Sequence, residues 1–113
     1  MNRALIVARI APDAQGEVAR IFGESDATSL PRELGVMERS LYVLGDVYVH
    51  AVTFDRDVDE AMAVARGHEG FAEISDQLRP HIAPYDPENW RSARDAMAQR
   101  FYHWEVATRR RVS

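Results

Sequence analysis

Two runs rich in β-branched and aromatic residues, 36–44 and 47–54, are separated only by the dipeptide Gly45-Asp46. Such a short, glycine-containing connection between two strand-like runs predicts a tight β-hairpin. This hairpin constrains the fold more than any other feature. If the last residue of the first run pairs with the first residue of the second, the register of both strands is fixed.

That register places Arg39 and His50 on one face of the hairpin, diagonally across adjacent strands. The other residues of this face are apolar: Met37, Leu41, Val43, Tyr48, Val52 and Phe54. The opposite face is also largely apolar, with Val36, Tyr42, Leu44, Val47 and Val49. We therefore expect both faces to be covered, either by helices on each side or by helices and a second subunit.

A guanidinium and an imidazole in an apolar wall indicate a small-molecule site. The alternative is structural. Arg39 would then pair with an acidic side chain, and His50 would be a hydrogen-bonded histidine of the sheet.

Length and composition predict one ordinary globular domain over residues 1–113, with 46% hydrophobic and 28% charged residues. The formal net charge of −4 gives no reason to expect nucleic acid or an anionic membrane as a partner. The absence of cysteine excludes disulfides, thiol catalysis and cysteine-ligated metals. The N-terminal apolar run carries Arg3 and Arg9 and is too short for a signal peptide or a membrane span, so we expect a cytoplasmic protein.

The first part of the chain predicts a strand and a helix. Residues 3–10 form a short apolar run typical of a buried strand. A helix follows, with Asp13 as its N-cap and with Val18, Ile21 and Phe22 at the spacing of a buried stripe.

The later elements complete the order of the fold. Residues 25–31 are rich in turn formers, and a helix that Gly67 interrupts is predicted over 58–78. A short helix within 89–99 and a final strand at 101–106 follow. The resulting order, βαββαβ, predicts a ferredoxin-like α+β fold with a four-stranded antiparallel sheet and helices on one face. A second copy of the chain is the simplest cover for the other face.

Cofactor motifs are missing from the sequence. His81 and His103 have no partner at metal-ligand spacing, so we predict no metal. Gly67 and Gly70 are isolated and do not form a phosphate-binding loop, so a nucleotide cofactor is not expected.

Five segments between Arg3 and Glu105 stand out together and in this order: RALIVARI, SDATSLPRELGV, LYVLGDVYVH, VARGHEGFAEI and APYDPENWRSARDAMAQRFYHWE. Through these segments the chain resembles the tetracenomycin-type aromatic polyketide cyclases. The D-A-T-S-L-P turn, the Y-V-H strand end and the F-Y-x-W segment are not general features of ferredoxin-like domains.

The resemblance implies a homodimeric α+β barrel in which each subunit encloses a cavity. It also implies a cofactor-free aldol-type cyclisation of a partly cyclised poly-β-ketone, followed by dehydration to an aromatic ring. A transient contact with the polyketide synthase or its acyl carrier protein is a further implied partner. The implied cavity groups fall on Asp26, Arg39 and His50, and less strongly on Arg66 and His68. Some family members carry a histidine where this chain has Ser25.

Each polar candidate also has an alternative interpretation. We expect His50 to act as the acid/base and Arg39 to stabilise an enolate or alkoxide. Asp26 is expected to assist in positioning or proton transfer, but turn formation alone also explains it. Arg66 and His68 flank a helix break where a pocket mouth could form, or they simply complement a helix end.

Aromatic residues are the remaining substrate-binding candidates. Tyr48, Tyr102 and Trp104 could stack on a flat polycyclic substrate, although aromatic strand residues belong more often to the core.

Two other functions stay open at this point. One is a cofactor-independent monooxygenase of the same fold that oxidises a phenolic ring to a quinone. The other is a non-catalytic subunit that binds and steers a polyketide. The monooxygenase needs oxygen, so an anaerobic assay distinguishes it from a cyclase.

Overall fold

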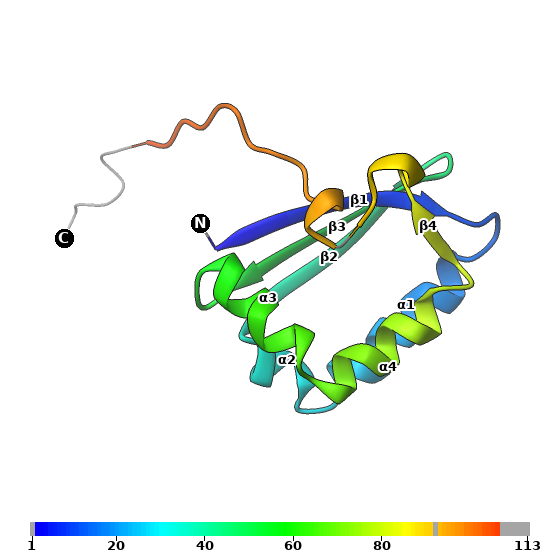
Figure 1. The fold of residues 1–113 in the computed structure, drawn as a ribbon, viewed down its shortest axis with the longest axis horizontal. Helices are drawn as coiled ribbons and strands as arrows, with labels where there is room; N and C mark the ends of the chain where they lie inside the picture. Colours follow the sequence, from blue (N-terminus) through cyan, green and yellow to red (C-terminus); the bar gives the residue numbers. More distant parts are fainter. Residues whose placement is uncertain (1, 92, 107–113) are drawn as a thin grey trace.

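The computed structural model describes residues 2–91 and 93–106. The elements in chain order are β1 (Arg3–Ile10), α1 (Gln15–Asp26), α2 (Leu30–Leu34), β2 (Val36–Leu44), β3 (Val47–Phe54), α3 (Val58–Arg66), α4 (Glu69–Leu78), β4 (Ile82–Pro84) and the 3-10 helices η1 (Pro87–Asn89) and η2 (Ala93–Ala96). The strands form one antiparallel sheet in the order β2-β3-β1-β4, and all four α-helices lie on one side of it (Figure 1). The predicted ferredoxin-like α+β architecture is confirmed.

The hairpin has the predicted bounds and register. Arg39 lies opposite Val52, and the pairing continues without a shift to the turn, where Gly45 has a φ of 62°. A left-handed conformation of this kind favours glycine.

The predicted register is wrong at the other end of β2. A bulge between Val36 and Glu38 shifts the register, and Met37 is 68% exposed instead of sharing the Arg39 face.

Helix α1 buries the predicted stripe of Val18, Ile21 and Phe22. The predicted N-cap is wrong, because the helix begins after Ala14 and Asp13 has a φ of 62°. Asp is among the residues that adopt this conformation in turns, so Asp13 forms part of the turn that precedes the helix.

The segment predicted as a turn over 25–31 is shorter than expected. Helix α1 continues to Asp26, and α2 begins at Leu30 with Pro31 in its first turn, where a proline costs no hydrogen bond. The predicted break at Gly67 is confirmed, since Gly67 follows the last residue of α3 and His68 caps α4.

The predicted last strand at 101–106 is wrong. Residues 82–84 form β4 and pair with the C-terminal half of β1, while Met97 makes an isolated bridge with Ile6 in its other half. The edge of β1 is therefore already occupied before residue 101. Phe101 and Trp104 are 96% and 68% exposed, and this segment leaves the body of the molecule (Figure 1). The expected short helix within 89–99 is present as η2.

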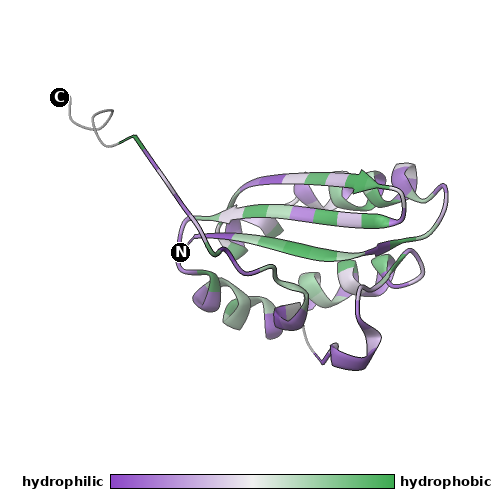
Figure 2. Ribbon diagram, turned by 90° about the horizontal axis from the view of Figure 1, so that it is seen from above, coloured by the Kyte–Doolittle hydropathy of each residue, from purple (hydrophilic) through white to green (hydrophobic). Residues whose placement is uncertain are grey.

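The two faces of the sheet differ in their cover. The face toward the helices contributes to the core through Ala4, Ala8, Ile10, Tyr48, Val52 and Phe54. The opposite face, turned toward the viewer in Figure 2, keeps Tyr42 61% and Leu44 83% exposed. Within the described residues, no helix is long and apolar enough to cross a membrane.

Candidate functional site

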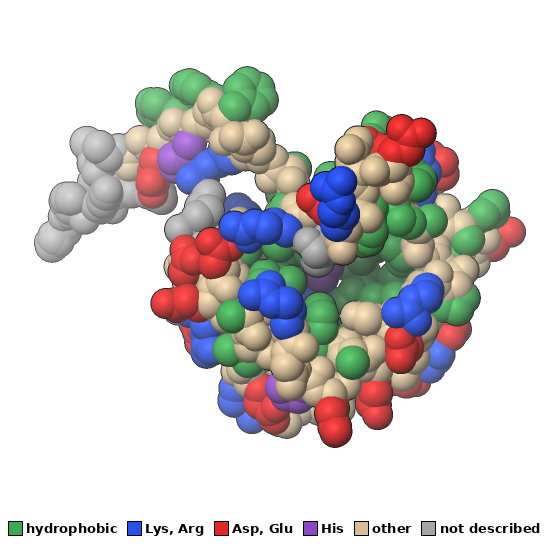
Figure 3. Space-filling view, in the orientation of Figure 1, with side chains coloured by type: hydrophobic (Ala, Val, Ile, Leu, Met, Phe, Trp, Pro, Cys, Tyr) green, Lys and Arg blue, Asp and Glu red, His purple; other side chains and the backbone are tan. Residues whose placement is uncertain are grey.

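A cavity of about 520 Å³ lies between the sheet and the helices, and Figure 3 shows that the molecule is hollowed at this place. This volume is typical of small-molecule sites. Its lining is mostly apolar, with Ile6, Leu34, Met62, Phe71, Ile74 and Leu78 among the contributors. The polar and charged side chains of the lining are Ser25, Arg39, Tyr48, His50, Ser75 and Arg79.

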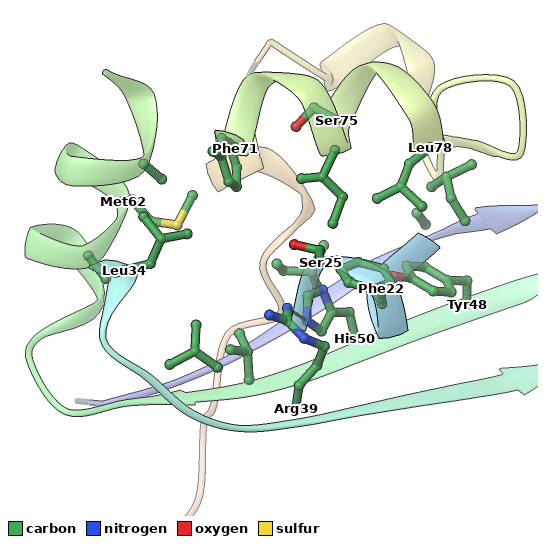
Figure 4. A pocket seen from close by; sticks show the side chains of 18 of the residues that line it. Phe22, Ser25, Leu34, Arg39, Tyr48, His50, Met62, Phe71, Ser75 and Leu78 are labelled. Atoms are coloured by element: carbon green, nitrogen blue, oxygen red, sulfur yellow. Dashed lines mark hydrogen bonds between the residues drawn. The ribbon is translucent and has the colours of Figure 1, made fainter. Parts of the chain in front are cut away.

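Arg39 and His50 meet inside this cavity, as the hairpin register predicts. The Arg39 guanidinium Nη1 lies 3.0 Å from His50 Nε2 (Figure 4). A guanidinium can only donate hydrogen bonds, so Nε2 must accept and the imidazole proton must reside on Nδ1. His50 is buried, and the described residues offer Nδ1–H no hydrogen-bond partner.

The surroundings of His50 determine its charge. Burial lowers the pKa of His50 to about 3, and the neighbouring Arg39 guanidinium acts in the same direction. The imidazole is therefore neutral at ordinary pH. This differs from the near-neutral titration that the residue type alone indicates.

Asp26, the last residue of α1, holds Arg39 from the opposite side. Its carboxylate oxygens accept from Nε and Nη2 at 3.1 Å and 2.9 Å. A guanidinium has five N–H groups. Three of them bind Asp26 and His50, which leaves two for a ligand. The Arg39 side chain is 15% exposed and that of Asp26 is 38% exposed, so this carboxylate also reaches water.

Phe22 completes the support of this pair. The Arg39 guanidinium carbon lies 4.8 Å above the centre of the Phe22 ring, and the His50 ring meets the same ring edge-on at 5.1 Å. Both are favourable geometries. Sequence periodicity placed Phe22 in the core, and it could not show that the core stripe of α1 also contacts the charged pair.

The helices and the C-terminal connection supply further lining residues, which are not among the candidates predicted from the sequence. Ser75 and Arg79 come from α4 and its C-terminal end, and Trp90 follows η1. Ser75 is four residues after Phe71, so the helical period already placed the two on one face. No local pattern pointed to Trp90.

Four predicted binding residues are not among those that line the cavity. Arg66 is the last residue of α3. His68 is the N-cap of α4, where its Nδ1 accepts from the Gly70 N–H and its Nε2 bonds with Glu33.

Tyr102 and Trp104 lie in the exposed C-terminal segment, where Tyr102 lines a separate cavity of about 330 Å³. Tyr48, by contrast, lines the main cavity.

No cluster of three or more potential metal ligands occurs in the described part of the chain.

Residues 2–105 match the family described as polyketide synthesis cyclase. The chain is 45% identical over 105 residues to polyketide synthase CurG of Streptomyces cyaneus, which covers 93% of this chain and 98% of that protein. It is 37% identical over 102 residues to tetracenomycin F2 cyclase of Streptomyces glaucescens, which covers 90% of this chain and 93% of that protein.

Solved structures agree with this similarity. Tetracenomycin F2 cyclase from Streptomyces glaucescens, described as a type-II polyketide cyclase, has a TM-score of 0.85 at 36% identity and covers 94% of this chain and 99% of that chain. SnoaB, a cofactor-independent oxygenase from Streptomyces nogalater, has a TM-score of 0.54 at 22% identity and covers 74% and 86%. At that identity the second likeness shows a shared fold alone.

Proposed function

The chain belongs to the polyketide synthesis cyclase family, and from this we propose that it catalyses the aldol-type ring closure and dehydration of a partly cyclised poly-β-ketone. One observation carries the chemistry. Arg39 is held in an apolar cavity by Asp26 and His50 and keeps two N–H groups for a ligand oxygen.

Ring closure joins an enol carbon of the substrate to a ketone carbon of the same chain. As the new bond forms, the ketone oxygen gains negative charge and the enol oxygen gives up its proton. The alkoxide takes up a proton, and loss of water then gives the aromatic ring. The difficult parts are bringing the two carbons together and stabilising the oxygen charge. By holding the two carbons together, a shaped cavity can lower the activation barrier by about 7–11 kcal/mol in favourable cases.

Arg39 is suited to stabilising the negative charge that develops on the ketone oxygen. We assign its two remaining N–H groups to the ketone oxygen under attack, where a fixed positive charge in an apolar wall is most effective. Asp26 is assigned a positioning role, because its two-point contact fixes the plane of the guanidinium.

His50 receives a different role from the proton shuttle expected from its residue type. With a pKa of about 3 it is a weak base, and Nε2 is already occupied by Arg39. We propose that it acts as a neutral imidazole. Its Nε2 orients Arg39, and its Nδ1–H is available to a substrate oxygen.

A second copy of the chain is the proposed cover of the open sheet face. Leu44 and Tyr42 lie exposed there, and Leu5 is 41% exposed on the same face. Apolar exposure of this kind on one side of a sheet favours a symmetric interface.

The test is an anaerobic incubation of the purified protein with a pathway intermediate. Ring closure that is faster and more regioselective than in buffer is the expected result. If oxygen is required, the monooxygenase alternative holds. If rate and product ratio equal those in buffer, the protein is not a cyclase. The steering alternative requires product distribution to survive both Arg39→Ala and His50→Ala.

A further inference from the structure

The Tyr48 side chain is buried, and its hydroxyl lacks a protein partner. Tyr48 is 4% exposed and packs in a core cluster that includes Ala8, Val18 and Ile74. It also lines the cavity, and Figure 4 shows its side chain reaching from β3 toward Phe22. Among the residues that the structure describes, none forms a hydrogen bond with this hydroxyl. A buried tyrosine hydroxyl normally has a partner, so this one calls for an explanation.

The position of the hydroxyl relates it to the charged pair. Tyr48 precedes His50 by two residues on the same strand, so both side chains point into the cavity. Their ring centres are 6.5 Å apart. Burial raises the pKa of Tyr48, so the hydroxyl stays protonated and remains a hydrogen-bond donor across the working pH range.

A poly-β-ketone carries an oxygen on every second carbon, so several of its oxygens look alike to a single donor. Arg39 alone can bind any of these oxygens, and each choice would join a different pair of carbons. A second donor removes this ambiguity if it binds an oxygen on the part of the substrate that is already cyclised. That rigid part does not repeat, so anchoring it fixes which oxygen of the remaining chain reaches Arg39.

We propose that the Tyr48 hydroxyl is this second donor. It binds a ketone or phenol oxygen outside the ring that is being closed, and so determines which carbons join. The inference rests on the proposed cyclase function. It adds the residue that sets the regiochemistry, a positioning role distinct from charge stabilisation by Arg39.

The test is the Tyr48→Phe variant, which removes the hydroxyl and keeps the packed ring. With the unliganded protein we expect an equal or higher melting temperature, because a buried hydroxyl without a partner contributes nothing to folding. With a pathway intermediate under anaerobic conditions we expect KM to rise by about 10-fold, the value of one lost hydrogen bond. The product ratio should shift toward the ratio formed in buffer.

Tyr85→Phe is the matched control, since Tyr85 is 50% exposed and does not line the cavity. It should leave the melting temperature, KM and product ratio unchanged. Two results would overturn the inference. An unchanged product ratio in Tyr48→Phe would show that the hydroxyl does not set the register. A melting temperature several degrees lower would show a structural hydrogen bond instead.

These failures are distinct from failure of the cyclase assignment. In that case the wild-type protein itself would not exceed the reaction in buffer, whatever the variant does.

Discussion

Arg39 shows how much of the site depends on the geometry of one side chain. Its guanidinium contacts a carboxylate along one edge, an imidazole along another and an aromatic ring on its face. An ammonium group could keep the charge but could not make these planar contacts together. The charge and its orientation are therefore separable by mutation.

We expect Arg39→Lys to lower kcat by about 100-fold, the usual effect of losing one well-placed donor to a developing oxyanion. Arg20→Lys is the control, because Arg20 pairs with Glu17 and Glu24 on the exposed side of α1. Steady-state kinetics of both variants measure the change in kcat. Full activity in Arg39→Lys would show that charge alone suffices and that the planar contacts are not needed.

The buried His50 also makes stability depend on pH. The unfolded chain takes up a proton on this residue below its ordinary pKa of 6.5, whereas the folded protein does so only near pH 3. The contribution is therefore complete above pH 6.5 and is lost as the pH falls toward 3. At pH 5 we expect a loss of about 2 kcal/mol in the free energy of unfolding.

Urea unfolding of wild type and His50→Gln at pH 7 and pH 5 isolates this loss, because the other titrating groups contribute to both proteins. The variant should lose about 2 kcal/mol less than wild type, and its amide keeps an acceptor for Arg39. His50→Gln should accordingly retain more activity than His50→Ala. Equal pH dependence in wild type and His50→Gln would contradict the assignment of a neutral, buried imidazole.

His68 joins the start of α4 to α2. Its Nδ1 accepts from the Gly70 N–H, so in the neutral tautomer its Nε2–H donates to the Glu33 carboxylate. Hydrogen bonds from Ser29 and then His68 lower the pKa of Glu33. Leu30 and Leu34 of α2 line the cavity, so this link helps to hold one of its walls.

We expect His68→Ala to lower the free energy of unfolding by about 1 kcal/mol, as for the loss of a helix N-cap. His68→Asn should recover most of this loss, because Asn is a strong N-cap. Denaturant unfolding of the two variants separates the cap from the contact with Glu33. If His68→Asn is as unstable as His68→Ala, the bond to Glu33 and not the cap is what stabilises α4.

The elements also show what sequence patterns can and cannot predict. The hairpin is determined locally, because Gly45 permits the turn and alternation fixes the faces. The meeting of Arg39 and His50 follows from that register. The pairing of the fourth strand, in contrast, is not determined by local sequence. Residues 82–84 have little strand propensity and pair with β1 because the chain passes its free edge after α4. Residues 101–106 have strong strand propensity, but β4 and Met97 already pair with the edge of β1 that these residues would need.

The same limit applies to the site. Asp26 was expected near the cavity from the resemblance, but no pattern indicated that its carboxylate binds Arg39 at two points. The pKa of His50 depends on burial by residues distant in sequence, which residue type alone does not reveal.

The second face of the sheet determines how the chain can assemble. Helices cover one face of the sheet and leave the other open (Figure 2). Tyr42 and Leu44 are exposed on the open face. A two-fold symmetric pair of chains would bury both copies of this face against each other. Such a dimer would leave the cavities on the outer, helical sides, so assembly and chemistry should be separable.

We expect Leu44→Glu to weaken this dimer by about 100-fold or more in dissociation constant, because an unpaired carboxylate would be buried in the interface. Val64→Glu is the matched control, since Val64 is 41% exposed on the helical side. Sedimentation equilibrium of wild type and both variants measures the effect. A wild-type protein that is monomeric at every concentration, or a Leu44→Glu variant that dimerises as tightly as Val64→Glu, would show that this face is not the interface.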